Sequence, residues 1–492
     1  MWNVVNGMSG AVIAVVVPPF LTKALSPEAY GAWALTLQMG TYVALFGFGL
    51  QVAVGRFIAH YEARGDIERR DGIVATAFWT LTASAAVGFA ILVGLAANVQ
   101  MLVPKLSADI LRETQLAIIL VALALAANLP ASVFAAVFIG RQESKVAAVI
   151  QGSGRLAIAA GLIAVGPFGN IALLGLVYVC VSACTIAALW YAWRTRTLAP
   201  TVRFALTSRK YLSELWDFCV SITLWSLAML LVNGLDLIIV GRFDYQATAY
   251  YAVSIALMSL VVGTLSSLSN ALVPAAARIP DADRATALPD LLLRSTRLIA
   301  GLALLIAAPL IFAPDIVLGL WLGSGYAAQA STILAILAVA ALLRNTMLPY
   351  VTIAIGLGEQ KRMTRTPLVE AGVTLALSLL LARQYGVIGV AAAKIAGGAV
   401  GVLLMLRQHV LEEQLGGMRR LAFLRETALR TLWAGGAVAV GMGALHYFAP
   451  TVPPLLRLLT LGFISVSSVW MLALHQSDRR MVVEFLRRRL PV

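Results

Sequence analysis

The fold is decided by stretches such as LAIILVALALAANLPASVFAAVFI at residues 116–139. This stretch carries no charge and exceeds the roughly 20 apolar residues that an α-helix needs to cross a bilayer. Similar runs recur along the 492 residues, of which 60% are hydrophobic and only 12% charged, with a mean hydropathy of +0.88. Because soluble domains contain about 25% charged residues, a soluble fold is excluded. The sequence predicts an all-α polytopic membrane protein.

Candidate spans follow one another along the whole chain. The runs predict a fold of about 14 transmembrane helices, since each is long enough to span the hydrocarbon core. The eleventh and twelfth runs are short and are separated only by a predicted turn at Tyr385-Gly386. The candidate spans lie roughly at residues 4–22, 30–50, 73–97, 116–139, 146–165, 170–193, 219–241, 248–270, 298–319, 328–350, 367–383, 386–406, 431–448 and 455–474.

The basic residues set the expected orientation. Most of the 37 lysines and arginines fall in every second loop between spans and in the C-terminal segment. Because Lys and Arg accumulate in cytoplasmic loops, we expect both termini in the cytoplasm and a multi-pass protein of the bacterial cell inner membrane. The same rule accounts for the net charge of +14, so no nucleic-acid partner is expected.

An internal repeat divides the chain. The segment IGRQESK at residues 139–145 ends the fourth span, and IGLGEQK at residues 355–361 ends the tenth. Spans one to six therefore resemble spans seven to twelve, and both halves enter the membrane from the same side. We expect two six-helix lobes related by an axis along the membrane normal, with a cavity between them, plus two C-terminal helices. The expected parts are an N-terminal lobe at 1–195, a cytoplasmic linker at 196–217, a C-terminal lobe at 218–410, a second linker at 411–430, two extra helices at 431–475 and a basic cytoplasmic tail at 476–492.

Five charged residues fall inside predicted spans. Arg155, Arg344 and Lys394 are cations, and Asp236 and Glu370 are acids. Each charge costs about 2.5–3.5 kcal/mol at the bilayer centre on insertion scales, so these side chains should face the protein interior or a watery cavity. Glu370 lies close to the inner end of its span and is expected at the membrane interface.

Two interpretations of these charges stay open. They can pair with one another as structural elements, or the cations can face an anionic ligand. Three cations against one deep acid, Asp236, leave a positive excess, which suits a pyrophosphate because Arg offers a bidentate fork and Lys a compact point charge. The candidate substrate-binding residues are Arg155, Arg344, Lys394 and Asp236, followed by Arg56 and Arg242 at the mouth of the cavity.

The sequence contains no recognisable catalytic or metal-binding motif. It has no Walker A loop, no serine nucleophile elbow and no kinase signature, and none of its four histidines stands in a metal-binding spacing. We therefore expect no enzyme activity, no cofactor and no metal.

Several segments resemble the Wzx-type polysaccharide flippases of the multidrug/oligosaccharidyl-lipid/polysaccharide exporter superfamily. They are LSPEAYGAW at residues 25–33, FGFGL at 46–50, NGLD at 233–236 and LWLG at 320–323. The resemblance covers nearly the whole chain, but it does not identify substrate-binding residues in this sequence.

The resemblance implies a lipid-linked oligosaccharide transport function. Such a flippase moves undecaprenyl-pyrophosphate-linked oligosaccharide repeat units from the cytoplasmic to the periplasmic leaflet by alternating access. The units serve O-antigen (lipopolysaccharide biosynthesis), capsule or exopolysaccharide assembly. The implied partners are membrane lipids, a polysaccharide polymerase and a chain-length regulator.

Three other functions compete with this one. An ion-coupled small-molecule or multidrug exporter of the same superfamily should carry a compact acidic cluster, whereas Asp236 is the only deep acid in the sequence. A lipid II flippase would share the fold and the pyrophosphate chemistry but not the sugar. A polysaccharide polymerase or ligase would need a large periplasmic loop, and the longest outside loop, residues 98–114, is short.

Overall fold

The computed structural model describes residues 13–196, single positions between 211 and 231, and residues 234–359, 365–407, 420–448 and 452–489. Within these ranges the regular elements are helices, and no strand is found. The chain forms two compact units, Met1–Ala252 and Val253–Val492. The boundary falls inside α12 (Thr248–Ser269). The division into lobes and linkers that the repeat predicts stays a prediction.

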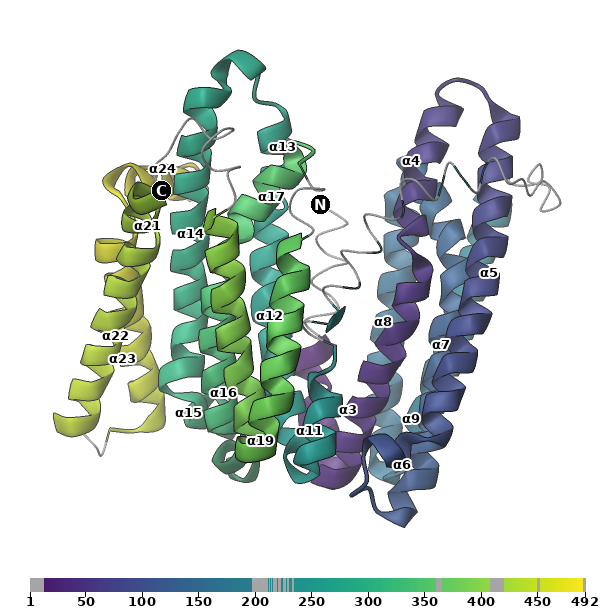
Figure 1. Cartoon of the computed structure of the whole chain (residues 1–492), viewed down its shortest axis with the longest axis horizontal. Coiled ribbons are helices and arrows are strands. Elements are labelled where there is room, and N and C mark those ends of the chain that lie inside the picture. The colour runs from purple at the N-terminus through teal and green to yellow at the C-terminus, as the bar shows by residue number, and fades with distance from the viewer. Residues whose placement is uncertain are drawn as a thin grey trace. The chain divides into compact units, whose positions relative to one another are not determined.

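Long helices that run alongside one another form the first unit (Figure 1). Ser26 caps the helix that begins at Pro27, because its hydroxyl accepts a hydrogen bond from the backbone N–H of Ala29 at 3.1 Å. Asp66 caps the next long helix in the same way, through the N–H of Arg69. The elements are α2 (Pro18–Ala24), α3 (Pro27–Thr41), η1 (Tyr42–Gly47), α4 (Leu50–Glu62), α5 (Ile67–Ala97), α6 (Val99–Leu102), α7 (Ala108–Gly140), α8 (Ser144–Val165), η2 (Gly166–Phe168), α9 (Ile171–Arg196), α11 (Asp236–Phe243) and η4 (Tyr245–Ala247).

The core of the first unit lies where α4, α5 and α7 meet. Ile58 from α4, Ile73 and Leu81 from α5, and Val133 and Phe138 from α7 are all almost completely buried. Residues exposed on the outer faces are largely apolar as well, which is the pattern of helices that face lipid rather than water.

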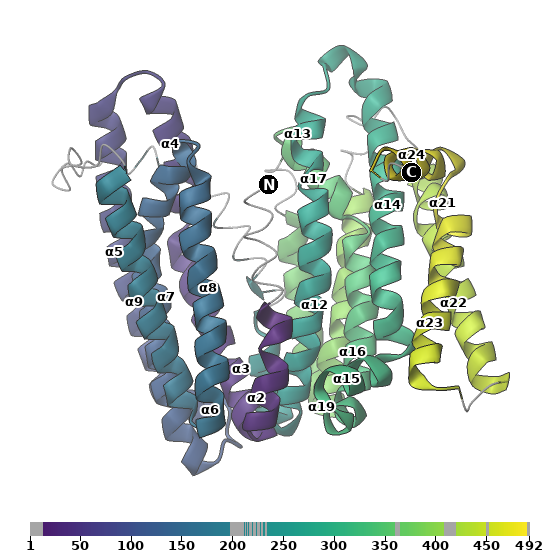
Figure 2. The same cartoon turned by 180° about the vertical axis from the view of Figure 1, so that it is seen from behind.

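The second unit holds the remaining helices (Figure 2). Ala308 of α14 packs with Val438 and Leu461, which belong to the predicted thirteenth and fourteenth spans. The elements are most of α12, α13 (Leu272–Ala277), η5 (Asp281–Asp283), α14 (Arg284–Phe312), α15 (Pro314–Leu322), α16 (Ser324–Asn345), α17 (Leu348–Gly356), α19 (Arg365–Arg407), α21 (Arg420–Glu426), α22 (Ala428–Phe448), α23 (Pro454–Ser468), the π-helix η6 (Val469–Ala473) and α24 (Gln476–Arg489).

The longest element, α19, is a hairpin of two helices. A straight helix of its 43 residues would be about 64 Å long, roughly twice the thickness of the hydrocarbon core. The chain instead turns at Gly386, whose φ of 54° and ψ of −135° lie outside the helical region. Only glycine adopts such a conformation without strain. The predicted turn at Tyr385-Gly386 is confirmed, and α19 contains both the eleventh and the twelfth spans.

Ten helices among the described residues are long and apolar enough to cross a membrane. The first predicted span corresponds to the shorter apolar helix Ile13–Ala24, and the second corresponds to α3 and η1. The seventh falls largely outside the described residues. The all-α polytopic fold is therefore confirmed. Counting α19 as two spans raises ten to 11, and the helices of the first and second predicted spans bring the number among the described residues to 13, close to the expected 14.

Candidate functional site

Two of the predicted site residues, Arg344 and Lys394, act on the same acid in the second unit. Arg344 lies in the last turn of α16, and its Nε is 2.7 Å from Oε1 of Glu370 on the first arm of α19. Lys394, on the second arm, also acts electrostatically on Glu370. Two cations therefore act on one carboxylate, and the formal charges of the three groups sum to one positive charge. We call them the three-charge cluster.

The small residues of α19 create the space for the three-charge cluster. A Cβ atom added at Gly401 would lie 2.8 Å from Oε2 of Glu370 and 3.1 Å from its Cδ. Only a glycine therefore allows the second arm to pack this closely against the Glu370 side chain. The sequence around it, KIAGGAVG at residues 394–401, combines the cation with the residues that let the acid approach.

Glu370 is buried within the protein. The residue is only 3% exposed, and its predicted depth near the membrane interface stays a prediction. Its partner comes from another span: the guanidinium of Arg344 stabilises the buried carboxylate. The Arg344 side chain itself is 32% exposed, so part of its guanidinium remains accessible.

Asp236 occupies a different polar site, in the first unit. It is the first residue of α11 and is 3% exposed. The carboxylate lies beside the phenol groups of Tyr42 and Tyr251. Just before it, the carbonyl of Gly234 accepts hydrogen bonds from the Tyr42 hydroxyl and from Nε2 of Gln38, the latter at 3.0 Å. The chain is therefore not helical immediately before Asp236, and residues of α3 and η1 hold that break.

The other three candidates lie on separate elements of the first unit. Arg155 lies on α8 and is partly exposed, whereas Arg56 is exposed on α4. Arg242, in the last turn of α11, donates through Nη1 to the carbonyl of Met101 at 2.7 Å. This bond ties α11 to α6, so Arg242 has a structural role whatever else it does. The structure thus brings Arg344 and Lys394 together and distributes the other four candidates over the first unit.

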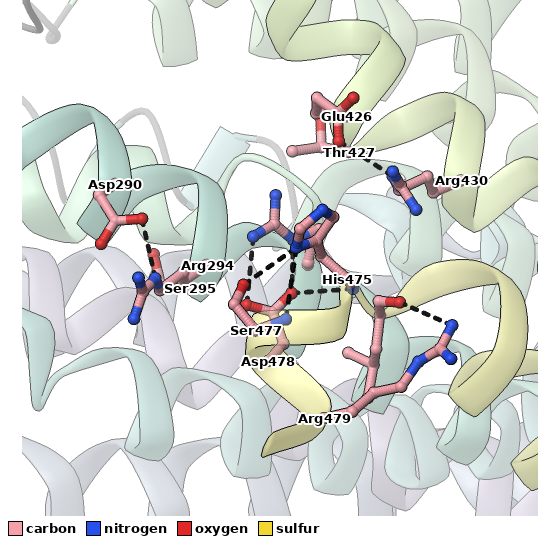
Figure 3. Close-up of polar contacts among 12 residues, drawn as sticks. Asp290, Arg294, Ser295, Glu426, Thr427, Arg430, His475, Ser477, Asp478 and Arg479 are labelled. Atoms are coloured by element: carbon pink, nitrogen blue, oxygen red, sulfur yellow. Dashed lines mark hydrogen bonds and ion pairs between the residues drawn. The ribbon is translucent and has the colours of Figure 1, made fainter. Parts of the chain in front are cut away.

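Sequence reasoning missed a second ion pair, between Arg297 of α14 and Asp478 of α24. Nε of Arg297 donates to Oδ2 of Asp478 at 2.6 Å, and Nη2 donates to Oδ1 at 3.1 Å. The two side chains are 7% and 0% exposed. Figure 3 shows Asp478 beside His475, whose backbone N–H donates to Oδ2 at 3.0 Å. We call this pair the α14–α24 clamp.

Neighbouring residues complete the α14–α24 clamp. Nη2 of Arg479 donates to the carbonyls of Met471 and Leu474, at 2.6 and 3.2 Å, and so satisfies the end of η6 (Figure 3). Asp478 falls in the segment predicted to be a basic cytoplasmic tail, residues 476–492. One feature of the sequence pointed to this pair: Asp478 directly precedes two arginines at the start of an amphipathic helix.

Titratable side chains in the described ranges do not gather into a metal site: no group of three His, Cys, Asp or Glu residues could hold an ion there.

The profile of a protein family described as "Polysaccharide biosynthesis protein" matches residues 1–280. No curated protein matches the chain by sequence.

Solved structures share the fold at low sequence identity. The chain is similar to a lipid II flippase, MurJ, in an inward closed conformation, with a TM-score of 0.72, 12% identity and coverage of 99% of this chain and 98% of that one. It is similar to a multidrug resistance MATE family transporter of the MOP superfamily, with a TM-score of 0.64, 13% identity and coverage of 87% and 94%. It is also similar to a MOP superfamily transporter from Pyrococcus furiosus, with a TM-score of 0.52, 14% identity and coverage of 83% and 95%.

Proposed function

Because this chain belongs to the polysaccharide biosynthesis protein family, we propose that it is a flippase for undecaprenyl-pyrophosphate-linked oligosaccharide repeat units. It moves them from the cytoplasmic to the periplasmic leaflet of the inner membrane by alternating access, for O-antigen, capsule or exopolysaccharide assembly. Both termini lie in the cytoplasm. A polysaccharide polymerase and a chain-length regulator receive the product, and the protein itself is not an enzyme.

The three-charge cluster is the observation that carries the proposal. A pyrophosphate needs cationic hydrogen-bond donors. Arg344 supplies a bidentate guanidinium and Lys394 a compact ammonium, on adjacent helices. The Arg344 side chain is 32% exposed, so an anion can reach it while Glu370 still holds it in place.

Glu370 gives the cluster a means of release. A flippase must let go of what it binds, and a site of cations alone would hold pyrophosphate too tightly. The carboxylate of Glu370 competes with the pyrophosphate for Arg344, because a guanidinium has a limited number of donors. Binding is therefore kept weak enough for turnover.

The other candidates have supporting places in this proposal. Arg155, Arg56 and Arg242 are further cationic contacts for the pyrophosphate along its path, and Asp236 is an acceptor for sugar hydroxyls. Arg155 has the strongest case of these, because it lies far from both ends of α8 and a charge at that depth is costly unless it is used or paired.

The lipid II flippase is the second candidate function. It is favoured by the fold match that covers 99% of this chain. The three-charge cluster would serve either lipid-linked substrate, since both carry the same kind of pyrophosphate, so the two candidates differ only in the saccharide.

A flipping assay with the purified full chain in proteoliposomes tests the proposal. The substrate is a fluorescent polyprenyl-pyrophosphate oligosaccharide, and fluorescently labelled lipid II is assayed in parallel. We expect Lys394→Ala to lower the flipping rate at least tenfold. The matched control is Lys145→Ala, an exposed lysine at the start of α8, which should flip at the rate of the unmodified chain. Normal flipping by Lys394→Ala would overturn the role of the cluster, and flipping of lipid II alone would favour the second candidate.

A further inference from the structure

An apolar groove runs along one face of the first unit, between α5, α7 and α9. It has a volume of about 680 Å³, in the range of pockets that bind small molecules, about 300–1,000 Å³. Phe78 and Trp79 of α5, Phe134 of α7 and Trp190 of α9 form its aromatic walls. The three helices are neighbours in the fold (Figure 2).

Small residues make up much of the remaining lining of the groove. Alanines of α7 and α9, among them Ala127 and Ala183, line it, and both are exposed. Pro130, inside α7, also lines it. A proline lacks the N–H that would bond to the carbonyl one turn earlier, and it commonly bends a membrane helix.

The groove faces lipid and reaches one end of the membrane. Trp79 and Trp190 are 49% and 43% exposed, which is typical of a membrane-facing surface. Along α9 the lining runs from Val179 to Trp190, about 16 Å of helix, or half of the roughly 30 Å hydrocarbon core. With the orientation proposed above, this half belongs to the cytoplasmic leaflet.

A cation stands at the cytoplasmic end of the groove. Arg194 lies one helical turn beyond Trp190, and its Cζ is 5.5 Å from the centroid of the Trp190 ring. The side chain is exposed. A guanidinium stacked on an aromatic ring keeps its edge donors directed outward, and phosphate oxygens fit these donors well.

We propose that this groove binds the isoprenoid chain of a polyprenyl phosphate lipid in the cytoplasmic leaflet, with Arg194 at the phosphate. Flat, unsaturated isoprene units with methyl branches suit a groove that alternates aromatic walls with alanines. Phe78 and Phe134, with ring centroids 5.9 Å apart, offer such units two neighbouring aromatic rings. The inference deepens the proposed function and rests on it: the groove holds the lipid chain of the substrate.

Photolabelling of the full chain in nanodiscs tests this inference. The probe is a sugar-free polyprenyl phosphate with a diazirine near the end of its chain, and labelled peptides are identified by mass spectrometry. We expect labelling on α7 and α9 that unlabelled polyprenyl phosphate competes away and that phosphatidylglycerol does not. Ala183→Phe, which fills the groove, should lower this labelling at least tenfold.

A matched control uses the same helix. Ala188 of α9 is also exposed but does not line the groove, so Ala188→Phe should be labelled like the unmodified chain. Ala127→Leu, on α7, provides a second and milder groove variant if Ala183→Phe inserts poorly. Arg194→Gln should weaken labelling by the phosphate probe about tenfold and leave labelling by the corresponding neutral polyprenol unchanged.

The outcomes separate this inference from the proposed function. Equal competition by phosphatidylglycerol would mean that the groove holds ordinary membrane lipid, and equal loss in Ala188→Phe would mean a general disturbance; either result overturns the inference. If the groove is labelled as expected but the chain flips no lipid-linked saccharide, the proposed function is overturned and the groove remains a lipid-binding site. If the chain flips its substrate normally but the groove is not labelled, the inference about the groove is overturned and the proposed function stands.

Discussion

The α14–α24 clamp and the three-charge cluster, both in the second unit, differ in composition and in exposure. In the α14–α24 clamp, one cation meets one carboxylate through two hydrogen bonds, and both side chains are 7% exposed or less. In the three-charge cluster, two cations share one carboxylate, and the Arg344 side chain is 32% exposed. A closed, balanced pair holds helices together, whereas an open cluster with a positive excess retains the capacity to bind an anion.

The largest effect should come from breaking the clamp. Asp478→Ala leaves the Arg297 guanidinium buried without its carboxylate, and we expect the free energy of unfolding to fall by about 3–5 kcal/mol. Thermal unfolding of the purified protein in detergent measures the loss. The double variant Arg297→Met/Asp478→Leu should recover most of it, since neither charge then remains. An Asp478→Ala protein as stable as the unmodified chain would show that the pair is not structural.

Crowding the three-charge cluster should have a smaller effect. A Cβ atom at Gly401 would lie 2.8 Å from Glu370 Oε2, so we expect Gly401→Ala to cost about 1–3 kcal/mol, the usual range for overpacking. The matched control is Gly372→Ala on the first arm of α19, where a Cβ atom meets nothing within 4 Å. Comparison of the two melting temperatures checks the prediction. An equal shift in both variants would contradict the close approach at Gly401.

Removing the charge of Glu370 should affect pyrophosphate binding more than the free energy of unfolding. Glu370→Gln keeps an acceptor oxygen for the Arg344 Nε, so we expect a loss of only about 1–2 kcal/mol. Pyrophosphate should bind more tightly because the competing carboxylate is gone, and flipping should slow because release becomes difficult. Pyrophosphate titration and the flipping assay measure the two effects. Weaker pyrophosphate binding in this variant would refute the competition between Glu370 and the substrate.

The smallest effect concerns the geometry of the clamp rather than its charge. Arg297→Lys keeps the charge but loses the fork that makes two bonds to Asp478, and we expect a cost of about 0.5–1.5 kcal/mol. The same thermal unfolding assay detects it. A loss as large as that of Asp478→Ala would mean that the bidentate geometry, and not the pairing of charges, stabilises α24.

The sequence predicts the helices of this fold better than it predicts their contacts. Hydropathy locates the spans because the bilayer demands about 20 apolar residues from each, and the turn at Gly386 follows from a glycine between two short runs. The same uniform hydropathy hides which face of a helix points inward. The sequence therefore does not show that Arg344 turns toward Glu370.

Contacts between distant spans are hidden for a further reason. Arg297 and Asp478 are 181 residues apart, and each looks like an ordinary charge beside a membrane span. The cost of a charge in lipid nevertheless singled out Arg344, Lys394 and Glu370 in the sequence. What the sequence could not supply was their common position, which depends on the hairpin of α19 and the packing of α16.

The order of the three charges along the chain matters for how the protein is made. Arg344 is synthesised first, Glu370 next and Lys394 last, so the acid enters the membrane between the two cations. As the helices emerge from the ribosome, the net charge of the inserted segment changes from one positive charge to zero and back to one. Two uncompensated cations never enter together, although each alone would cost about 2.5–3.5 kcal/mol in the bilayer centre. The turn at Gly386 then brings the arm that carries Lys394 back along the arm that carries Glu370.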